Sequence, residues 1–153
     1  MRIVLASILI IFCCSFNTWE TNFEKAKQQA VQEHKAILLS FSGSDWCGPC
    51  IKLHSEVFES PAFKTFADKN LVLVNADFPR QKKNQLPKPL QQQNDKLADT
   101  YNSSGAFPLT VLLTADGKVL KSWEGYPKMA IDEFIDDIFK TMNPNQPALQ
   151  NPE

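Results

Sequence analysis

The sequence predicts an α/β domain with a central, mixed four-stranded sheet and helices on both faces. Two short apolar runs, residues 36–41 and 71–76, have the length and composition of buried strands, with room for a helix between them. Residues 109–113 and 119–123 flank Asp116-Gly117, a dipeptide typical of tight hairpins. Because long connections permit parallel pairing and a hairpin imposes antiparallel pairing, the sheet should contain both.

The predicted helices follow from periodicity and from capping residues. Apolar side chains recur at helical spacing from Trp19 to Glu33, so the first helix should cover that range. After a turn at 42–45, the spacing of Cys50, Leu53 and Val57 predicts a second helix that starts near Cys47. Ser60-Pro61 is typical of an N-cap followed by the first residue of a third helix.

The second half of the chain is less regular. Residues 78–95 contain three prolines and five glutamines with no apolar period, which predicts a long surface loop. A short helix should follow through Leu97 and Tyr101. A clear apolar stripe from Ile131 to Met142 predicts the last helix.

Length and charge limit the possible functions. The 153 residues suit one domain, and 43% of them are hydrophobic, enough to form a substantial core. The formal net charge of −1 gives no reason to expect a nucleic acid or an anionic membrane surface as partner. We expect a single domain that acts as a monomer.

The N-terminus resembles an export signal. Arg2 precedes a run of apolar residues at 3–12, too short for a span of about 20 residues, so residues 1–15 are predicted to be a secretory signal peptide. Alternatively, a lipid attached to Cys13 or Cys14 would anchor the protein to a membrane. We therefore expect an exported protein, periplasmic or secreted.

Removal of that signal would leave a domain at 16–142 and a tail at 143–153. The tail is rich in Pro, Asn and Gln and is predicted to be disordered. The mature chain would keep only Cys47 and Cys50, in a compartment where disulfides persist. Such a pair can bond to itself or exchange with partners.

Cys47 and Cys50 follow a predicted strand and turn, in the stretch SDWCGPCIK at 44–52. Free backbone N–H groups and the positive end of the helix dipole favour a thiolate at a helix start, where a cysteine pKa can fall to about 3.5–7.5. Cys47 is therefore the expected nucleophile. Cys50, nearly one turn later on the apolar face, would resolve the mixed disulfide. Pro49 stiffens the short loop between them.

The cysteine pair has two other conceivable roles. Zinc would need two further ligands, and only His34 and His54 are available after export. A purely structural disulfide would close a very small loop and stabilise little. Covalent haem is excluded because Ile51, not histidine, follows the motif.

Residues 46–50, WCGPC, resemble the active-site motif of the thioredoxin superfamily at every position, and the element order fits from Trp19 to Thr141. Phe107-Pro108 matches the family's cis-proline, and Gly125 a glycine of its binding surface. The resemblance implies a thioredoxin-like fold and a thiol–disulfide oxidoreductase in which Cys47 and Cys50 are catalytic. The implied substrate-binding residues are Trp46, Gly48, Pro49, Phe107, Pro108 and Gly125.

The same resemblance implies protein substrates with disulfides and an upstream thiol electron donor, which can be membrane-bound. It implies no metal and no cofactor beyond the redox-active Cys47–Cys50 disulfide. By family resemblance, the Gly48-Pro49 dipeptide favours a reductase. An oxidising compartment favours an oxidase or isomerase instead. The alternative is a binding module whose groove and 78–95 loop hold a partner without needing the cysteines.

The sequence also departs from the family. Thioredoxins often bury an Asp on the strand before the motif, paired with a Lys on the next strand. Here the corresponding strands read Leu39-Ser40-Phe41 and Leu71–Val74, with neither residue. Asp45 is nearer to the motif, but we expect it to be solvated in a turn. The opening strand is also absent and 78–95 is an insertion, as in exported single-domain bacterial members.

Overall fold

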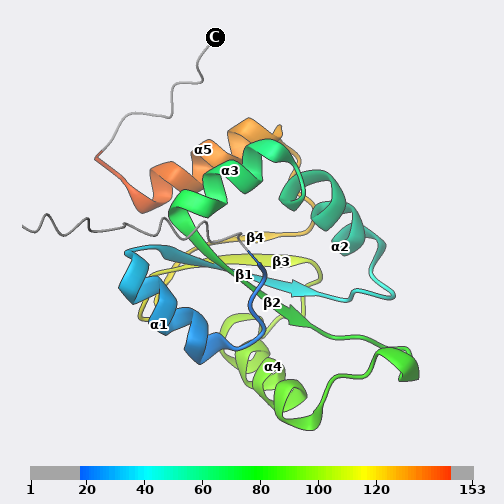
Figure 1. Ribbon diagram of the computed structural model, residues 1–153. Helices are drawn as coiled ribbons and strands as arrows, with labels where there is room; N and C mark the ends of the chain where they lie inside the picture. Colours follow the sequence, from blue (N-terminus) through cyan, green and yellow to red (C-terminus); the bar gives the residue numbers. More distant parts are fainter. Residues whose placement is uncertain (1–17, 146–153) are drawn as a thin grey trace, which may run out of the picture.

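The computed structural model of the protein describes residues 18–145 (Figure 1). Its strands are β1 (Ala36–Ser42), β2 (Leu71–Asp77), β3 (Leu109–Leu113) and β4 (Val119–Glu124). Its helices are α1 (Phe23–Glu33), α2 (Gly48–Leu53), the π-helix η1 (His54–Phe58), α3 (Pro61–Asn70), the 3₁₀ helix η2 (Lys82–Asn84), α4 (Lys88–Tyr101) and α5 (Ile131–Met142).

The sheet has the strand order β2-β1-β3-β4 and is mixed, as predicted. β1 pairs in parallel with β2, and antiparallel with β3. β3 and β4 form the expected antiparallel hairpin around Asp116-Gly117. In this register Ser40 lies beside Asn75 on one side and Thr110 on the other.

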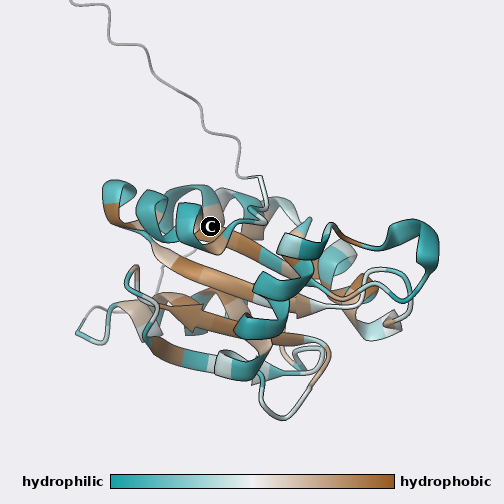
Figure 2. Ribbon diagram, turned by 90° about the horizontal axis from the view of Figure 1, so that it is seen from below, coloured by the Kyte–Doolittle hydropathy of each residue, from teal (hydrophilic) through white to brown (hydrophobic). Residues whose placement is uncertain are grey.

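Helices cover both faces of the sheet because successive strand residues point to opposite sides. In Figure 1, α1 and α4 lie below the sheet, whereas α2, α3 and α5 lie above it. Below, Ile37 and Leu39 pack with Phe23 of α1 and Leu97 of α4. Above, Leu38 packs in the cluster that holds Phe63, Phe134 and Ile138. Figure 2 shows the apolar strands between the more hydrophilic helices.

The first helix starts later than predicted. It begins at Phe23, because the Asn22 side chain caps it by accepting a hydrogen bond from the Lys25 N–H. Glu20 instead forms an isolated parallel bridge with Val74 of β2. This bridge is the only pairing on the outer edge of β2 among residues 18–145. The described residues therefore contain no opening strand, in agreement with the sequence.

The prediction of a loop over 78–95 is wrong for its second half. Helix α4 starts at Lys88, and the carbonyl of Pro87 accepts hydrogen bonds from the Leu90 and Gln91 N–H groups. Two of the three prolines that suggested a loop, Pro87 and Pro89, lie at the N-cap and in the first turn of this helix, where a missing N–H breaks no internal hydrogen bond. The buried face of α4 carries Asn94 and Leu97. The irregular part of the insertion is therefore confined to 78–87, interrupted by η2.

The predicted signal peptide at 1–15 and most of the predicted tail at 143–153 lie outside the described residues. Between residues 18 and 145, no helix is long and apolar enough to cross a membrane.

Candidate active site

Cys47 and Cys50 form a disulfide with an S–S distance of 2.03 Å. Cys47 is the N-cap of α2, as expected from its place after the turn, and its sulfur accepts a hydrogen bond of 3.3 Å from the Cys50 N–H. The Cys47 N–H is itself bonded to the Gly43 carbonyl. Both cysteines are 4% exposed, so in this oxidised form burial does not distinguish them. Gly48 and Pro49 between them are exposed.

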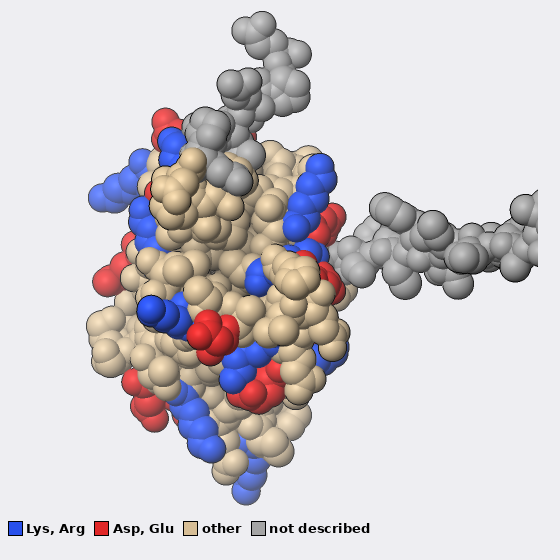
Figure 3. Space-filling model, turned by 90° about the vertical axis from the view of Figure 1, so that its left-hand side faces the viewer, with Lys and Arg blue, Asp and Glu red and all other residues tan. Residues whose placement is uncertain are grey.

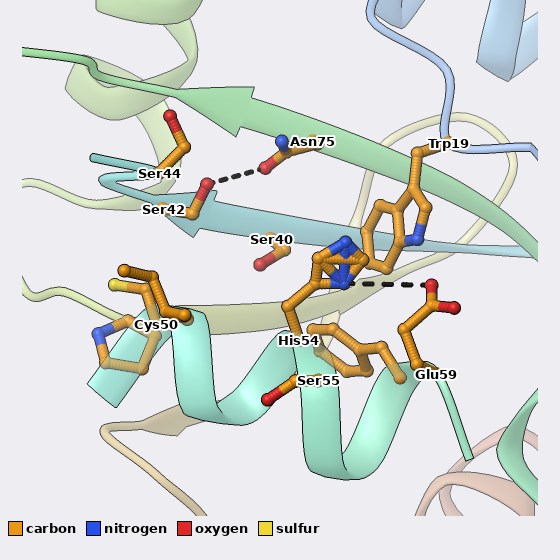
Figure 4. A pocket seen from close by; sticks show the side chains of 12 residues that line it. Trp19, Ser40, Ser42, Ser44, Cys50, His54, Ser55, Glu59 and Asn75 are labelled. Carbon is orange, nitrogen blue, oxygen red and sulfur yellow. Dashed lines mark hydrogen bonds and ion pairs between the residues drawn. The ribbon is translucent and has the colours of Figure 1, made fainter. Parts of the chain in front are cut away.

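A cavity of about 400 Å³ adjoins Cys50 (Figure 4). The ends of β1 and β2 line it with Ser40 and Asn75, and Trp19 and His54 lie opposite. Its acidic lining residue is Glu59, which lies 3.9 Å from His54 Nδ1 and is half exposed.

Neutral polar residues occupy the sheet beneath α2, where the family resemblance implies an acid. Ser40, 5% exposed, is flanked in register by Asn75 and Thr110. The Thr110 hydroxyl is buried and has no hydrogen-bond partner among the described residues. Two residues further along β1, Ser42 donates a hydrogen bond to Asn75 Oδ1 at 2.8 Å. The polar residues on this part of the sheet are therefore neutral hydroxyl and amide groups rather than an acid.

Trp46 closes the other side of the disulfide. Its Nε1–H donates to the Phe78 carbonyl at 2.7 Å, and the Arg80 guanidinium lies over its ring at 3.5 Å. Its ring meets that of Phe107 edge-to-face with centroids 5.4 Å apart. Gly43 leaves room for the indole, because a Cβ at residue 43 would lie 2.7 Å from Trp46 Cζ2 and closer still to two other ring atoms.

Asp45 joins the motif to the insertion. Its carboxylate accepts hydrogen bonds of 2.9 Å from the Arg80 N–H, the Gln81 N–H and the Asn84 side chain. These bonds, that from Arg80 first, lower the pKa of Asp45. Asp45 therefore lies partly exposed in the turn, as expected, and in addition holds the start of the insertion against the active-site turn.

The predicted substrate-binding residues lie together at one end of the sheet. The Phe107–Pro108 peptide bond is cis, as the resemblance implies. Pro108 lines the cavity that adjoins Cys50, and its carbonyl accepts a hydrogen bond of 2.8 Å from the Gly125 N–H. Trp46 contacts Phe107 on the other side. Their roles in binding remain predictions.

Sequence reasoning missed Gly43, Phe78 and Arg80. The residues around Gly43 indicate only a turn, and no local signal predicts that the Trp46 indole packs against it. Phe78 and Arg80 lie more than 30 residues from Trp46 in sequence, inside a segment read as a solvated loop. The missed signal was Asp45, a carboxylate two positions before the nucleophile and a natural acceptor for loop N–H groups.

Comparisons with known proteins agree with this arrangement. A family model for thioredoxin-like proteins matches residues 18–115. The disulfide bond reductase DsbH of Chlamydia pneumoniae is 41% identical over 102 residues, 67% of this chain and 59% of that protein. The thioredoxin-related protein DsbJ of the same organism is 30% identical over 96 residues, 63% of this chain and 27% of DsbJ. The chain thus spans less than two thirds of the length of either curated relative.

Solved structures show the same fold. A structure of a DsbH oxidoreductase covers 92% of this chain and 94% of its own, with a TM-score of 0.75 and 29% identity. A thioredoxin from Thermus thermophilus covers 84% of this chain and 88% of its own, with a TM-score of 0.63 and 14% identity.

Proposed function

This chain belongs to the thioredoxin-like family, and from that premise we propose that it is an exported thiol–disulfide oxidoreductase that reduces disulfides in proteins. The observation that carries the proposal is the Cys47–Cys50 disulfide at the N-cap of α2. Trp46 and Pro108 flank it on its two sides. A sulfur at that position has the surroundings that thiol–disulfide exchange needs.

The chemistry follows from the two sulfurs. In the reduced protein, the Cys47 thiolate attacks one sulfur of a substrate disulfide, and the other substrate sulfur leaves as a thiolate. Cys50 then loses its proton and attacks Cys47 Sγ, which releases the second substrate thiolate. The substrate has gained two electrons, and the protein is left with the disulfide seen here. An upstream dithiol donor restores both thiols by the same exchange.

Cys50 must lose a proton during the second step. On the sheet side of the cavity the lining residues are Ser40 and Asn75, neither of which is a base at neutral pH. The lining residues that carry an imidazole and a carboxylate, His54 and Glu59, are 54% and 45% exposed, so they lie at the rim in contact with solvent. We infer that the Cys50 proton leaves to solvent in the cavity rather than to a buried acid.

The reductive direction and the location have separate support. The name of the relative DsbH, disulfide bond reductase, supports reduction, as does Gly48-Pro49 by family likeness. The pattern of residues 1–15 supports export to the periplasm or beyond, with a lipid on Cys13 or Cys14 as the alternative. The proposed partners are disulfide-containing proteins and a thiol electron donor. The redox disulfide is the only cofactor proposed.

The decisive experiment is the reduction potential of the Cys47–Cys50 pair, measured by equilibrating the protein with dithiothreitol or glutathione buffers. A potential near the reducing end of the thioredoxin range, about −270 mV, supports the reductase. A potential near the oxidising end, about −120 mV, assigns the protein to disulfide donors or isomerases instead. Absence of a reversible two-electron couple would overturn the redox function.

Single variants locate the chemistry. Cys47→Ser should abolish reduction of a protein disulfide, whereas Cys50→Ser should accumulate a mixed disulfide through Cys47. Cys13→Ser with Cys14→Ser is the matched control and should leave the couple unchanged. If the Cys47→Ser, Cys50→Ser double variant kept its biological activity and its partner, the binding-module function would replace the reductase.

A further inference from the structure

The insertion between β2 and α4 carries cations without acidic partners. Residues 78–88 contain Arg80, Lys82, Lys83 and Lys88 and no Asp or Glu, in a chain of net charge −1. All four side chains are exposed, and none forms an ion pair with another described residue. This segment is therefore a local positive surface.

Lysines of the opposite face are arranged differently. In and around α1, Lys25, Lys27 and Lys35 each lie within 2.9 Å of a glutamate oxygen. Figure 3 shows the face over α1 with cations and acids interspersed. Among the described residues, Lys69, Lys96, Lys118 and Lys128 also form no ion pair, but they lie apart, on α3, on α4 and in two connections of the second half. The segment 80–88 is distinct because it gathers four such cations within nine residues.

The structure holds these cations in place beside the disulfide. Asp45 accepts hydrogen bonds from the Arg80 and Gln81 N–H groups and from the Asn84 side chain, so η2 and the two residues before it are fixed to the active-site turn. The Gln85 side chain donates to the Pro79 carbonyl at 3.0 Å, which closes the segment on itself. Asp45 lies two positions before Cys47, so the positive surface adjoins the predicted nucleophile.

Arg80 has the geometry of a carboxylate receptor. Its guanidinium stacks 3.5 Å from the Trp46 ring centroid, which orients the plane of the group. No hydrogen bond uses its guanidinium N–H groups within residues 18–145, so its fork of donors is available to a bidentate acceptor. Trp46 in turn contacts Phe107 of the predicted substrate surface. A polypeptide bound there would pass the guanidinium edge.

We propose that Arg80, with Lys82 and Lys83, selects substrate polypeptides that carry acidic residues next to their disulfide. This inference rests on the reductase function proposed above and names its substrate class. Two carboxylates, Asp77 and Asp95, line the adjoining cavity of about 460 Å³, so the acidic side chain binds at the outer, Arg80 rim rather than inside. Asp77 is already held by Ser42 and Ser44.

The test uses three disulfide-bridged peptides that differ only in two residues beside one cysteine, which are Glu, Gln or Lys. We expect kcat/KM to fall in that order, by about two- to fivefold per step, since exposed ion pairs contribute about 0.2–1 kcal/mol. Raising the salt from about 0.02 to 0.3 M should reduce the spread, because it shortens the screening length.

Variants assign the preference to the positive surface. Arg80→Gln should reduce the Glu-over-Gln preference, and Arg80→Gln with Lys82→Gln and Lys83→Gln should abolish it. Lys118→Gln is the matched control, since it removes an exposed cation from the β3–β4 hairpin, at the far end of β3 from Pro108. Reduction of all three peptides at equal rates would overturn this inference and leave the reductase intact. Reduction of none would overturn the reductase itself.

Discussion

The two sides of the Cys47–Cys50 disulfide are built in opposite ways. On one side Trp46 is fixed by a hydrogen bond to Phe78, by the stacked Arg80 and by the edge of Phe107. On the other side Cys50 adjoins a cavity of about 400 Å³. We call these the Trp46 side and the Cys50 side. Both sides adjoin a cavity, of about 460 Å³ beside Trp46 and about 400 Å³ beside Cys50, but the residues of the Trp46 side are cross-linked to one another around the indole.

This difference matches the two tasks in thiol–disulfide exchange. The nucleophile must be presented to a bound polypeptide in a defined geometry, and rigid neighbours reduce the entropy lost on reaching it. The resolving thiol must lose a proton, which requires access to a proton acceptor. A cross-linked side therefore suits attack by Cys47, and a cavity beside Cys50 suits its deprotonation.

The largest effect should come from filling the space under Trp46. In Gly43→Ala the new Cβ would overlap the indole, so the ring must move and its contacts with Phe78 and Arg80 must change. We expect a loss of about 1–3 kcal/mol in the free energy of unfolding, measured by urea denaturation. Gly48→Ala is the control, because a Cβ there meets no atom within 4 Å. Equal stability of the two variants would show that the Trp46 side is not tightly packed.

On the Cys50 side, Ser40→Asp should be destabilising in a pH-dependent way. Residue 40 is 5% exposed, and no cationic Lys or Arg lines its cavity, so burial should raise the carboxyl pKa above its usual value of about 3.9. An acid whose pKa is raised on folding destabilises the fold progressively as the pH rises above its unfolded pKa. The full loss is about 1.4 kcal/mol for each pH unit that separates the folded pKa from the unfolded one.

The measurement is urea denaturation of Ser40→Asp and Ser40→Ala between pH 4 and pH 8. The two variants should differ little at pH 4 and diverge toward pH 8. A constant difference across this range would mean that the inserted carboxyl keeps its usual pKa, and that the cavity is more solvated than its walls indicate.

The elements predicted correctly are those with local signals. Ser60 caps α3 by accepting a hydrogen bond from the Phe63 N–H, as the Ser-Pro pair predicted. The apolar runs of β1 and β2, the turn at Asp116-Gly117 and the apolar stripe of α5 are likewise signals carried by residues close together in sequence. The sequence does not predict the start of α4, because prolines are typical of loops, whereas Pro87 and Pro89 stand at the beginning of this helix.

In the candidate site, too, the features with local signals could be predicted and those that depend on distant residues could not. The cysteine pair, its place at a helix start and the cis-proline position could be predicted, because the motif and its flanks are contiguous or match a family pattern. The bonds from Asp45 to the insertion could not, since they join residues about 35 positions apart. Such contacts depend on the path of a loop, which carries no periodic signal.

A smaller effect is expected from Asp45→Asn, which weakens the attachment of the insertion without altering the core. Because hydrogen bonds lower the pKa of Asp45 in the folded state, its contribution is present above the unfolded pKa of about 3.9 and is lost as the pH falls through the folded value. The thermal midpoints of wild type and variant should therefore differ at pH 7 and converge near pH 2.

At neutral pH, trypsin should cleave Asp45→Asn faster than wild type after Arg80, Lys82 or Lys83, because the segment is released from the turn. Asp99→Asn, an exposed carboxylate on α4, is the control and should behave like wild type in both assays. Unchanged cleavage in Asp45→Asn would mean that contacts such as that between Gln85 and Pro79 suffice to hold the insertion.

The smallest effect on stability should come from residues at the rim of the cavity on the Cys50 side. His54 and Glu59 are 54% and 45% exposed and 3.9 Å apart, so His54→Gln should change the free energy of unfolding by less than about 0.5 kcal/mol at pH 6 or pH 8. The cavity wall is instead formed by Trp19 packed on Phe58, with ring centroids 5.1 Å apart. A loss above about 1 kcal/mol would mean that the contacts of His54 hold the Cys50 side, which would then be as cross-linked as the Trp46 side.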